Sequence, residues 1–453
     1  MKSRTMSTSP EVCPPIAAII GLHELLRATL RAPMSGPEPP DAVQPAFEAP
    51  GTPGPTRPRA VLFIVFLTIL IDFIGFTVLI PVLPLFAERL GASDFEVALI
   101  LSVYALAQLV FLPVWGWVSD RIGRRPVILV SLLGTVGSFV MLTFADSIEM
   151  IYAARALAGF FAASIGTAQA VVTDVTSPSE RASGMGIIGA AFGAGMIVGP
   201  ILGGITAEID EKAPFYSVAA LAAVNFVLAW AWLPESRPVE LEPPNWKELR
   251  QTFIPTPVRV MMMVHDRRIA LYLYFFFHLF SAFAVLEALI TLYAGKQFGK
   301  QALDISYLFA WIGVVLFVTQ GVLLRRLVAA VGESRLVALG MFTMAIGLAT
   351  VAWAPSFVWL YPVGTLLAFG NGVTFPTFTS LYSRACEADN AGELLGQSQA
   401  MATTGRIVGP ALGGLVMERW FLGGPFVIAG GMMLVALVMF WIFRRALLIS
   451  EAH

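Results

Sequence analysis

Long apolar runs separated by short polar breaks dominate the chain from Ala60 onward. Each run holds about 20 residues, which as a helix cross the roughly 30 Å hydrocarbon core of a bilayer. The pattern therefore predicts an all-α integral membrane protein with twelve transmembrane helices, over residues 60–85, 95–117, 126–144, 148–172, 184–206, 214–233, 269–293, 304–324, 335–354, 357–381, 396–417 and 424–443.

The polar breaks divide these helices into two groups of six. The longest internal break, residues 234–268, is rich in proline and charge and is predicted to be a central cytoplasmic loop. It separates a first six-helix bundle, residues 60–233, from a second, residues 269–443. Residues 444–453 are predicted to form a short cytoplasmic tail.

Residues 1–59 have a different character. They are rich in Pro, Gly and Ala and have no apolar period, which is typical of a disordered tail, here cytoplasmic. Residues 16–30 are apolar and basic, but they are too short to cross a membrane and lack a small-residue cleavage site. We therefore expect no signal peptide, and Met34 is an alternative start to Met1.

The positive charges indicate the orientation. If the N-terminus is cytoplasmic, most Lys and Arg residues lie in cytoplasmic segments, and the opposite side carries only Arg89, Lys212, Lys296, Lys300 and Arg419. Such a bias follows the positive-inside rule. We expect a multi-pass protein of a cell inner (plasma) membrane, with both termini in the cytoplasm.

The composition excludes several classes of protein. Hydrophobic residues make up 57% of the 453 residues and charged residues only 13%, whereas soluble proteins carry about 25% charged residues. The net charge of −1 argues against a nucleic-acid partner. Two cysteines and four scattered histidines offer no metal-ligand spacing, and no phosphate-binding loop is present. We expect no cofactor, no metal and no enzymatic activity.

A glycine and proline pattern repeats with a period of 210 residues and links the two halves. Its two copies are Gly186, Gly195, Gly199, Pro200, Gly203 and Gly204, and Gly396, Gly405, Gly409, Pro410, Gly413 and Gly414. They fall on the predicted fifth and eleventh helices. Duplicated halves related by a pseudo-two-fold axis are a common design of secondary transporters, with the substrate site near the bilayer midplane.

A second motif lies between the predicted second and third helices, at Gly116, Asp120, Arg121, Gly123, Arg124 and Arg125. These residues resemble the signature cytoplasmic loop of the major facilitator superfamily. The resemblance implies that the loop acts as a conformational latch, in which Asp120 accepts from Arg124 or from a helix N-terminus of the other half. In the simpler alternative, the arginines only determine topology.

Further motifs resemble the twelve-helix drug/proton antiporters of that superfamily. Residues 104–108 with Pro113, and residues 173–177 with Arg181, are similar to the second helix and the fourth-to-fifth connection of the tetracycline efflux proteins among them. Asp72 and Gly75 with the following Pro81 and Pro84 are similar to the first-helix motif, and Arg155 to a fourth-helix arginine motif. The repeat beginning at Gly186 resembles the fifth-helix motif of antiporters. The chain departs from the tetracycline efflux pattern, because residues 307–322 lack a histidine and residues 127–144 and 336–353 lack carboxylates.

Ionisable residues inside apolar helices cost about 3 kcal/mol or more at mid-helix, so those present mark candidate functional positions. As proton-coupling residues we predict Asp72, Glu287 and Arg155; as substrate-cavity residues we predict Gln108, His278, Asn371 and Arg406. Three of these residues have a structural alternative: Asp72 as a hydrogen-bonding group, Glu287 as a group that meets water, and His278 as a packed ring among phenylalanines.

These observations favour a secondary transporter that exports a small amphipathic, drug-like compound in exchange for protons. In one interpretation this compound is tetracycline-like. The expected partners are protons, the substrate and the lipid bilayer. We expect the protein to be a monomer. One alternative is a proton-coupled uptake symporter for a nutrient or an organic anion. Another is a transporter-like receptor or structural membrane protein without flux, which the charged residues inside the helices disfavour.

Overall fold

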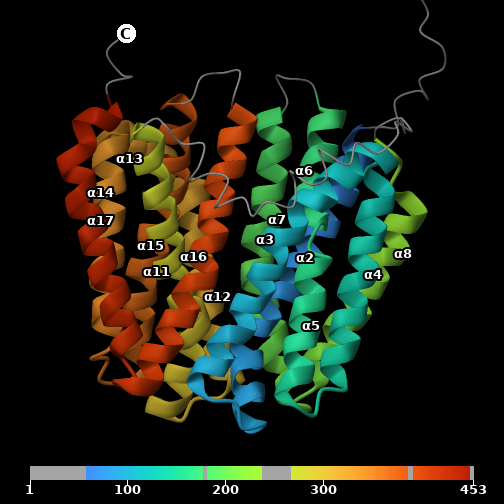
Figure 1. Ribbon diagram of the computed structural model, residues 1–453, viewed down its shortest axis with the longest axis horizontal. Helices are drawn as coiled ribbons and strands as arrows, with labels where there is room; N and C mark the ends of the chain where they lie inside the picture. Colours follow the sequence, from blue (N-terminus) through green and yellow to red (C-terminus); the bar gives the residue numbers. More distant parts are fainter. Residues whose placement is uncertain (1–57, 177–180, 237–266, 386–390, 449–453) are drawn as a thin grey trace, which may run out of the picture. The chain divides into compact units, whose positions relative to one another are not determined.

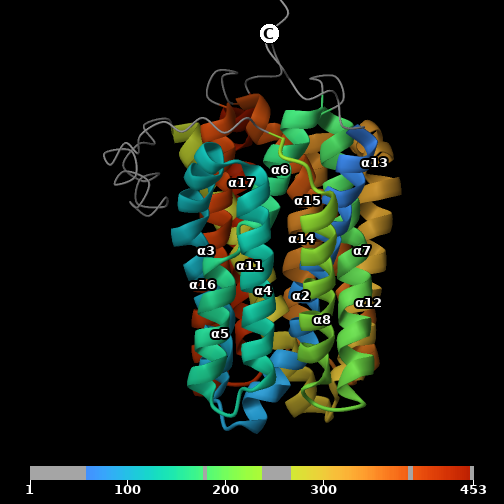
Figure 2. The same ribbon diagram turned by 90° about the vertical axis from the view of Figure 1, so that its right-hand side faces the viewer.

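Long helices running side by side make up the computed structural model, which describes residues 58–176, 181–236, 267–385 and 391–448 (Figures 1 and 2). The first half contains α2 (Pro58–Arg89), α3 (Asp94–Ile122), α4 (Arg124–Thr143), α5 (Ile148–Phe160), α6 (Ser164–Val175), α7 (Arg181–Ala207) and α8 (Ala213–Trp232). The second half contains α11 (Arg267–Phe298), α12 (Ala302–Val318), the π-helical turn η1 (Thr319–Leu323), α13 (Leu324–Val331), α14 (Glu333–Val351), the 3₁₀ turn η2 (Phe357–Trp359), α15 (Leu360–Ala385), α16 (Ala391–Arg419) and α17 (Gly424–Leu448).

Each of the twelve predicted spans falls on helical structure, and the all-α prediction is confirmed. Within the described residues, ten helical segments are long and apolar enough to cross a membrane. The two remaining spans are α15 and α16, with 26 and 29 residues. The predicted tail at residues 1–59, apart from the first two residues of α2, and most of the loop at 234–268 lie outside the described residues.

Two spans that the sequence predicts as continuous are interrupted. The span from Ile148 to Val175 breaks between α5 and α6, and the span from Ala302 to Val331 contains the π-helical turn η1. At the first break the buried Ser131 hydroxyl donates to the Phe161 carbonyl and accepts from the Ser164 amide at 3.1 Å. These bonds satisfy backbone groups that the interrupted helix leaves free. At the other end of the chain, α17 continues to Leu448, so the first residues of the predicted C-terminal tail are helical.

Apart from Gly186 and Gly396, which meet open space, the repeated glycines lie where helices approach each other closely. A Cβ built on Gly199 of α7 would lie 2.9 Å from the carbonyl oxygen of Ile74 on α2. In the second half, a Cβ on Gly409 of α16 would lie 2.5 Å from the carbonyl oxygen of Ser281 on α11. Only glycine permits such contacts between backbones. The two halves thus repeat the same packing, with α7 on α2 and α16 on α11.

The last glycine of each motif packs across the halves instead. A Cβ on Gly204 of α7 would lie 2.9 Å from the Cα of Leu303 on α12. Its counterpart on Gly414 of α16 would lie 3.0 Å from the carbonyl oxygen of Asp94 on α3. The halves therefore meet along two equivalent seams, α7 with α12 and α16 with α3.

The outer surface is apolar, as a lipid-facing surface must be. Large apolar side chains are exposed along the helices, and tryptophans such as Trp232 and Trp420 are exposed near helix ends, where they suit the membrane–water interface. We call the end of the helices that carries Asp120 and Arg124 the loop end. The opposite end, which carries Glu88, is the far end.

Candidate functional site

A cavity lies between the two halves, in the middle of the helices. It consists of two adjoining chambers of about 90 and 40 Å³. The wall common to both chambers comes from α2, α3, α5 and α16 and includes Phe76, Tyr104, Gln108, Arg155 and Arg406. Pockets for drug-sized ligands have volumes of roughly 300–1,000 Å³. A ligand of that size therefore requires this cavity to widen.

Arg155 of α5 is the most deeply buried charge of the common wall. Only 2% of the residue is exposed, and its guanidinium lies over the Tyr104 ring, 4.4 Å from the ring centroid. Its Nε and Nη2 atoms are buried and have no hydrogen-bond partner among the described residues. Buried charged donors are normally satisfied, and leaving them unpaired costs free energy. A bound ligand or water can supply the missing acceptors.

Asp72 of α2 lines the larger chamber. One carboxylate oxygen, Oδ2, accepts a hydrogen bond from the Ser164 hydroxyl at the start of α6. The other, Oδ1, is buried and has no hydrogen-bond partner in the described part of the chain. The helix break held by Ser131 is what brings Ser164 to this carboxylate, so the interruption of the fourth span positions part of the cavity wall.

Glu287 of α11 and Arg406 of α16 come from the second half. Glu287 is 8% exposed and lines the smaller chamber. The Arg406 guanidinium lies 5.7 Å from the centroid of the Phe280 ring and 6.0 Å from that of Phe76 on the opposite half. Among the described residues, neither the Asp72 carboxylate nor the Glu287 carboxylate forms an ion pair with Arg155 or Arg406 within 4.0 Å. Four ionisable side chains thus share one cavity without neutralising one another directly.

The structure separates the remaining predicted cavity residues. Gln108 lines both chambers. His278 and Asn371 line neither of them. The Nδ1 atom of His278 lies 2.9 Å from the Tyr274 carbonyl oxygen, and its ring centroid lies 3.9 Å from that of the Tyr274 ring, with the two planes tilted by 41°. These contacts fit a packed histidine.

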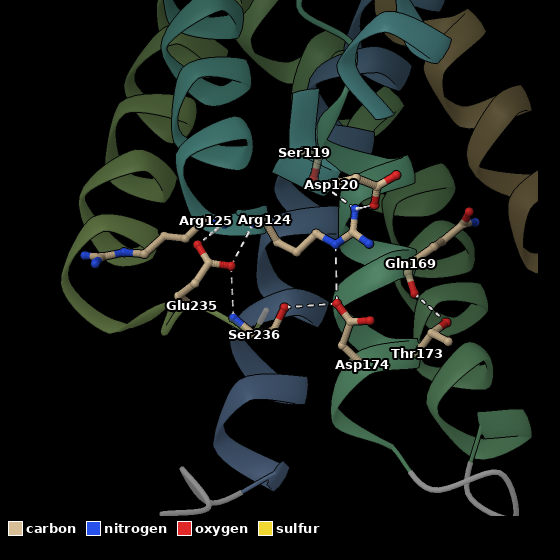
Figure 3. A network of polar contacts seen from close by, with 9 residues as sticks. All are labelled: Ser119, Asp120, Arg124, Arg125, Gln169, Thr173, Asp174, Glu235 and Ser236. Carbon is tan, nitrogen blue, oxygen red and sulfur yellow. Dashed lines mark hydrogen bonds and ion pairs between the residues drawn. The ribbon is translucent and has the colours of Figure 1, made fainter. Parts of the chain in front are cut away.

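The signature loop forms a second polar site, at the loop end (Figure 3). Figure 3 shows Arg124 between the carboxylates of Asp120 and Asp174. Its Nη1 atom lies 2.8 Å from Asp120 Oδ1, and its Nε atom lies 3.3 Å from Asp174 Oδ2. Arg124 also donates to the Ser119 hydroxyl at 3.2 Å. Arg121 lies over the Trp117 ring at 3.9 Å. A Cβ at Gly116 would meet open space. These contacts join α3, α4 and α6 of the first half.

Glu235, just after α8, is a member of this network that sequence reasoning missed. Its carboxylate accepts from the backbone amides of Arg124 at 2.7 Å and Arg125 at 3.1 Å. It therefore caps the N-terminus of α4, where Gly123 has no side chain to do so. Gly123 adopts φ of +96°, and a Cβ there would lie 2.7 Å from the Glu235 Cδ atom. The glycine thus admits both the turn and the carboxylate.

At the far end, ion pairs and backbone contacts join the halves. Lys296 of α11 lies 2.5 Å from Asp94 of α3 and 3.5 Å from Glu88 of α2. The Thr291 hydroxyl of α11 donates to the Ile80 carbonyl of α2 at 3.0 Å. The far ends of the halves are therefore held together around Lys296.

Paired helical halves around a central polar cavity define a multi-pass membrane protein with the architecture of a secondary transporter. The model of the Major Facilitator Superfamily matches residues 65–407 and 323–450. The chain belongs to this superfamily, a family of membrane transporters for small molecules and not of enzymes. The family resemblance found in the sequence is thereby confirmed.

Two bacterial resistance proteins are similar to this chain over most of its length. The class B tetracycline resistance protein of Escherichia coli is 29% identical over 373 residues, which cover 79% of this chain and 90% of that protein. Multidrug resistance protein 2 of Bacillus subtilis is also 29% identical, over 84% of this chain and 94% of that protein.

Solved structures share the fold. The human organic anion transporter MFSD10 (TETRAN) superposes with a TM-score of 0.66 at 23% identity, covering 84% of this chain and 99% of that chain. The peptide transporter POT in complex with sulfate gives a TM-score of 0.73 at 15% identity, covering 86% of this chain and 95% of that chain. At these identities the likeness supports the fold alone.

Proposed function

We propose that the protein exports a small amphipathic, drug-like compound in exchange for protons by alternating access. The observation that carries the proposal is the cluster of Asp72, Glu287, Arg155 and Arg406 in one cavity between the halves. A carboxylate in such a place changes protonation readily, because burial disfavours its charged form and an approaching cation favours it. The similarity to tetracycline and multidrug resistance proteins supports a drug-like substrate.

The loop end is assigned to the cytoplasm in this proposal, because it carries most of the positive charge. Both termini are then cytoplasmic, in an inner membrane. In this proposal the far end, joined by Lys296, faces outward. Its ion pairs between the halves support a state that is closed on the outside and receives substrate from the cytoplasm or the inner leaflet.

The transport cycle follows from this arrangement. Substrate enters the cavity while Asp72 or Glu287 gives up its proton to the cytoplasm. The halves then rock along the α7–α12 and α16–α3 seams, and the latch residues around Asp120 and Arg124 stabilise the state that is closed at the loop end. Substrate leaves, a proton binds from outside, and the halves return. A membrane potential of 100 mV supplies about 2.3 kcal/mol for each charge moved.

The test is drug-triggered proton release from proteoliposomes that contain the purified protein. Tetracycline is added first, followed by cationic and neutral drugs, to the native protein and to Asp72→Asn and Glu287→Gln variants. Glu211→Gln, an exposed carboxylate at the far end, is the matched control. We expect release with the native protein and the control, and its loss in at least one of the two cavity variants. Absence of release from the native protein with every drug contradicts the proposal.

A further inference from the structure

We propose that the exported compound is dipolar: its acidic group binds between Arg155 and Arg406, and its positively charged nitrogen binds at Asp72. This inference rests on the proposed function and specifies its substrate class. It starts from two residues that line the same chamber, Arg155 and Asp72. The guanidinium of one and the carboxylate of the other carry buried atoms that have no hydrogen-bond partner in the described part of the chain.

The unpartnered donors of Arg155 suit a carboxylate or a similar anion. Nε and Nη2 lie on the same edge of the guanidinium plane, so their N–H groups point in parallel and can bind both oxygens of one acidic group. The ring of Tyr104 supports the guanidinium face and limits its movement. Arginine is the residue that best satisfies such planar, two-point recognition.

Arg406 adds a second positive charge to the same wall. Its guanidinium lies near the rings of Phe76 and Phe280, one from each half of the protein. An acidic group held by Arg155 and Arg406 would therefore contact both halves. The aromatic rings beside it suit a flat, apolar ligand skeleton.

Asp72 provides the opposite pole. Its Oδ2 accepts from Ser164, and its buried Oδ1 has no hydrogen-bond partner among the described residues. A protonated or otherwise cationic nitrogen satisfies this oxygen and favours the ionised carboxylate.

The two poles together agree with exchange against protons. A purely anionic ligand at the arginines would favour protonated carboxylates, because it adds negative charge to the cavity, and it would therefore travel with protons. A ligand that also brings a positive charge to Asp72 displaces the proton instead. The dipolar substrate thus accounts for both the unpaired arginine donors and the proposed antiport.

Three dyes with one skeleton test the assignment. Rhodamine 110 carries a carboxylate and a cationic amine system, rhodamine 123 is its methyl ester and lacks the carboxylate, and fluorescein has hydroxyl groups in place of the amines. Binding is measured by fluorescence anisotropy with the full-length protein in lipid nanodiscs, without any gradient. Hydrogen bonds to charged groups predict that rhodamine 110 binds roughly tenfold to a hundredfold more tightly than rhodamine 123.

Variants then identify the groups responsible. Arg406→Gln or Arg155→Gln should abolish the preference for rhodamine 110; Arg406 is half-buried, so its replacement is the safer one for folding. Asp72→Asn should weaken both rhodamines and leave fluorescein unchanged. Arg89→Gln, an exposed arginine at the far end, is the control and should bind like the native protein.

Equal binding of the two rhodamines, no binding of any dye, or a preference that survives both arginine replacements overturns the inference. These results are distinct from failure of the proposed function. If drugs release protons but the ester binds as well as the acid, only the substrate assignment is wrong. If rhodamine 110 binds as expected but no drug moves protons, only the exchange is wrong.

Discussion

Replacing Lys296 with methionine removes the ammonium group that joins the halves at the far end. Two ion pairs are lost, with Asp94 at 2.5 Å and with Glu88 at 3.5 Å. The Lys296 side chain is 35% exposed, and its partners are 12% and 36% exposed, so water screens both interactions. Pairs of this kind contribute about 0.2–1 kcal/mol each. The variant should therefore lose about 0.5–2 kcal/mol of stabilisation of the closed far end.

That free energy predicts a measurable change in population. It multiplies the ratio of far-end-open to far-end-closed molecules by roughly twofold to thirtyfold. Methionine keeps a side chain of similar length, so packing changes little. The matched control is Lys300→Met, because Lys300 pairs at 3.3 Å with Asp304 of its own half and does not bridge the two halves.

The assay is a distance distribution between two spin labels in nanodiscs. Labels replace Ile209 and Val358, which are 79% and 72% exposed at the far end of opposite halves. The two native cysteines, Cys13 and Cys386, are replaced with serine. Lys296→Met should increase the longer-distance population, and Lys300→Met should not. An unchanged distribution in Lys296→Met, or an equal change in both variants, refutes the idea that Lys296 holds the far end closed.

Two further predictions concern stability of the purified protein, measured as the midpoint of thermal unfolding in detergent. Gly409→Ala places a Cβ 2.5 Å from the Ser281 carbonyl oxygen, and this overpacking should lower the free energy of unfolding by about 1–3 kcal/mol. Gly396→Ala, whose Cβ meets open space, is the control and should be neutral. Equal midpoints in the two variants would show that α16 can shift away from α11. Glu235→Gln removes the charge that caps α4 and should lower the free energy of unfolding by about 1 kcal/mol, while Glu211→Gln should have little effect. An unchanged midpoint in Glu235→Gln would show that the charge of this carboxylate does not stabilise α4.

The helices could be predicted from the sequence because the bilayer sets their length. Apolar runs separated by polar breaks mark each span, and α4, predicted over 126–144, occupies Arg124–Thr143. The break between α5 and α6 could not be predicted in this way. It depends on Ser131, a residue of another helix whose hydroxyl replaces local backbone bonds.

Part of the candidate site could be predicted from the sequence for a similar reason. Charges such as Asp72, Glu287 and Arg406 stand out within apolar runs because a membrane helix tolerates few of them. His278 stands out equally, yet it lines neither chamber, because the face of a helix that meets the cavity depends on tertiary packing. Glu235 gave no signal: it lies in a polar segment, and its role comes from a helix N-terminus 111 residues away.

The most direct test of drug/proton exchange is drug accumulation in proteoliposomes under opposite pH gradients. Vesicles with an acidic interior and vesicles with an alkaline interior receive the same labelled tetracycline, or another drug that releases protons in the assay above, and empty liposomes correct for passive distribution. Proton exchange predicts accumulation when the interior is acidic and exclusion when it is alkaline, with both effects lost in Asp72→Asn or Glu287→Gln. Accumulation driven by an alkaline interior would mean that substrate and protons travel together, and it would contradict the account.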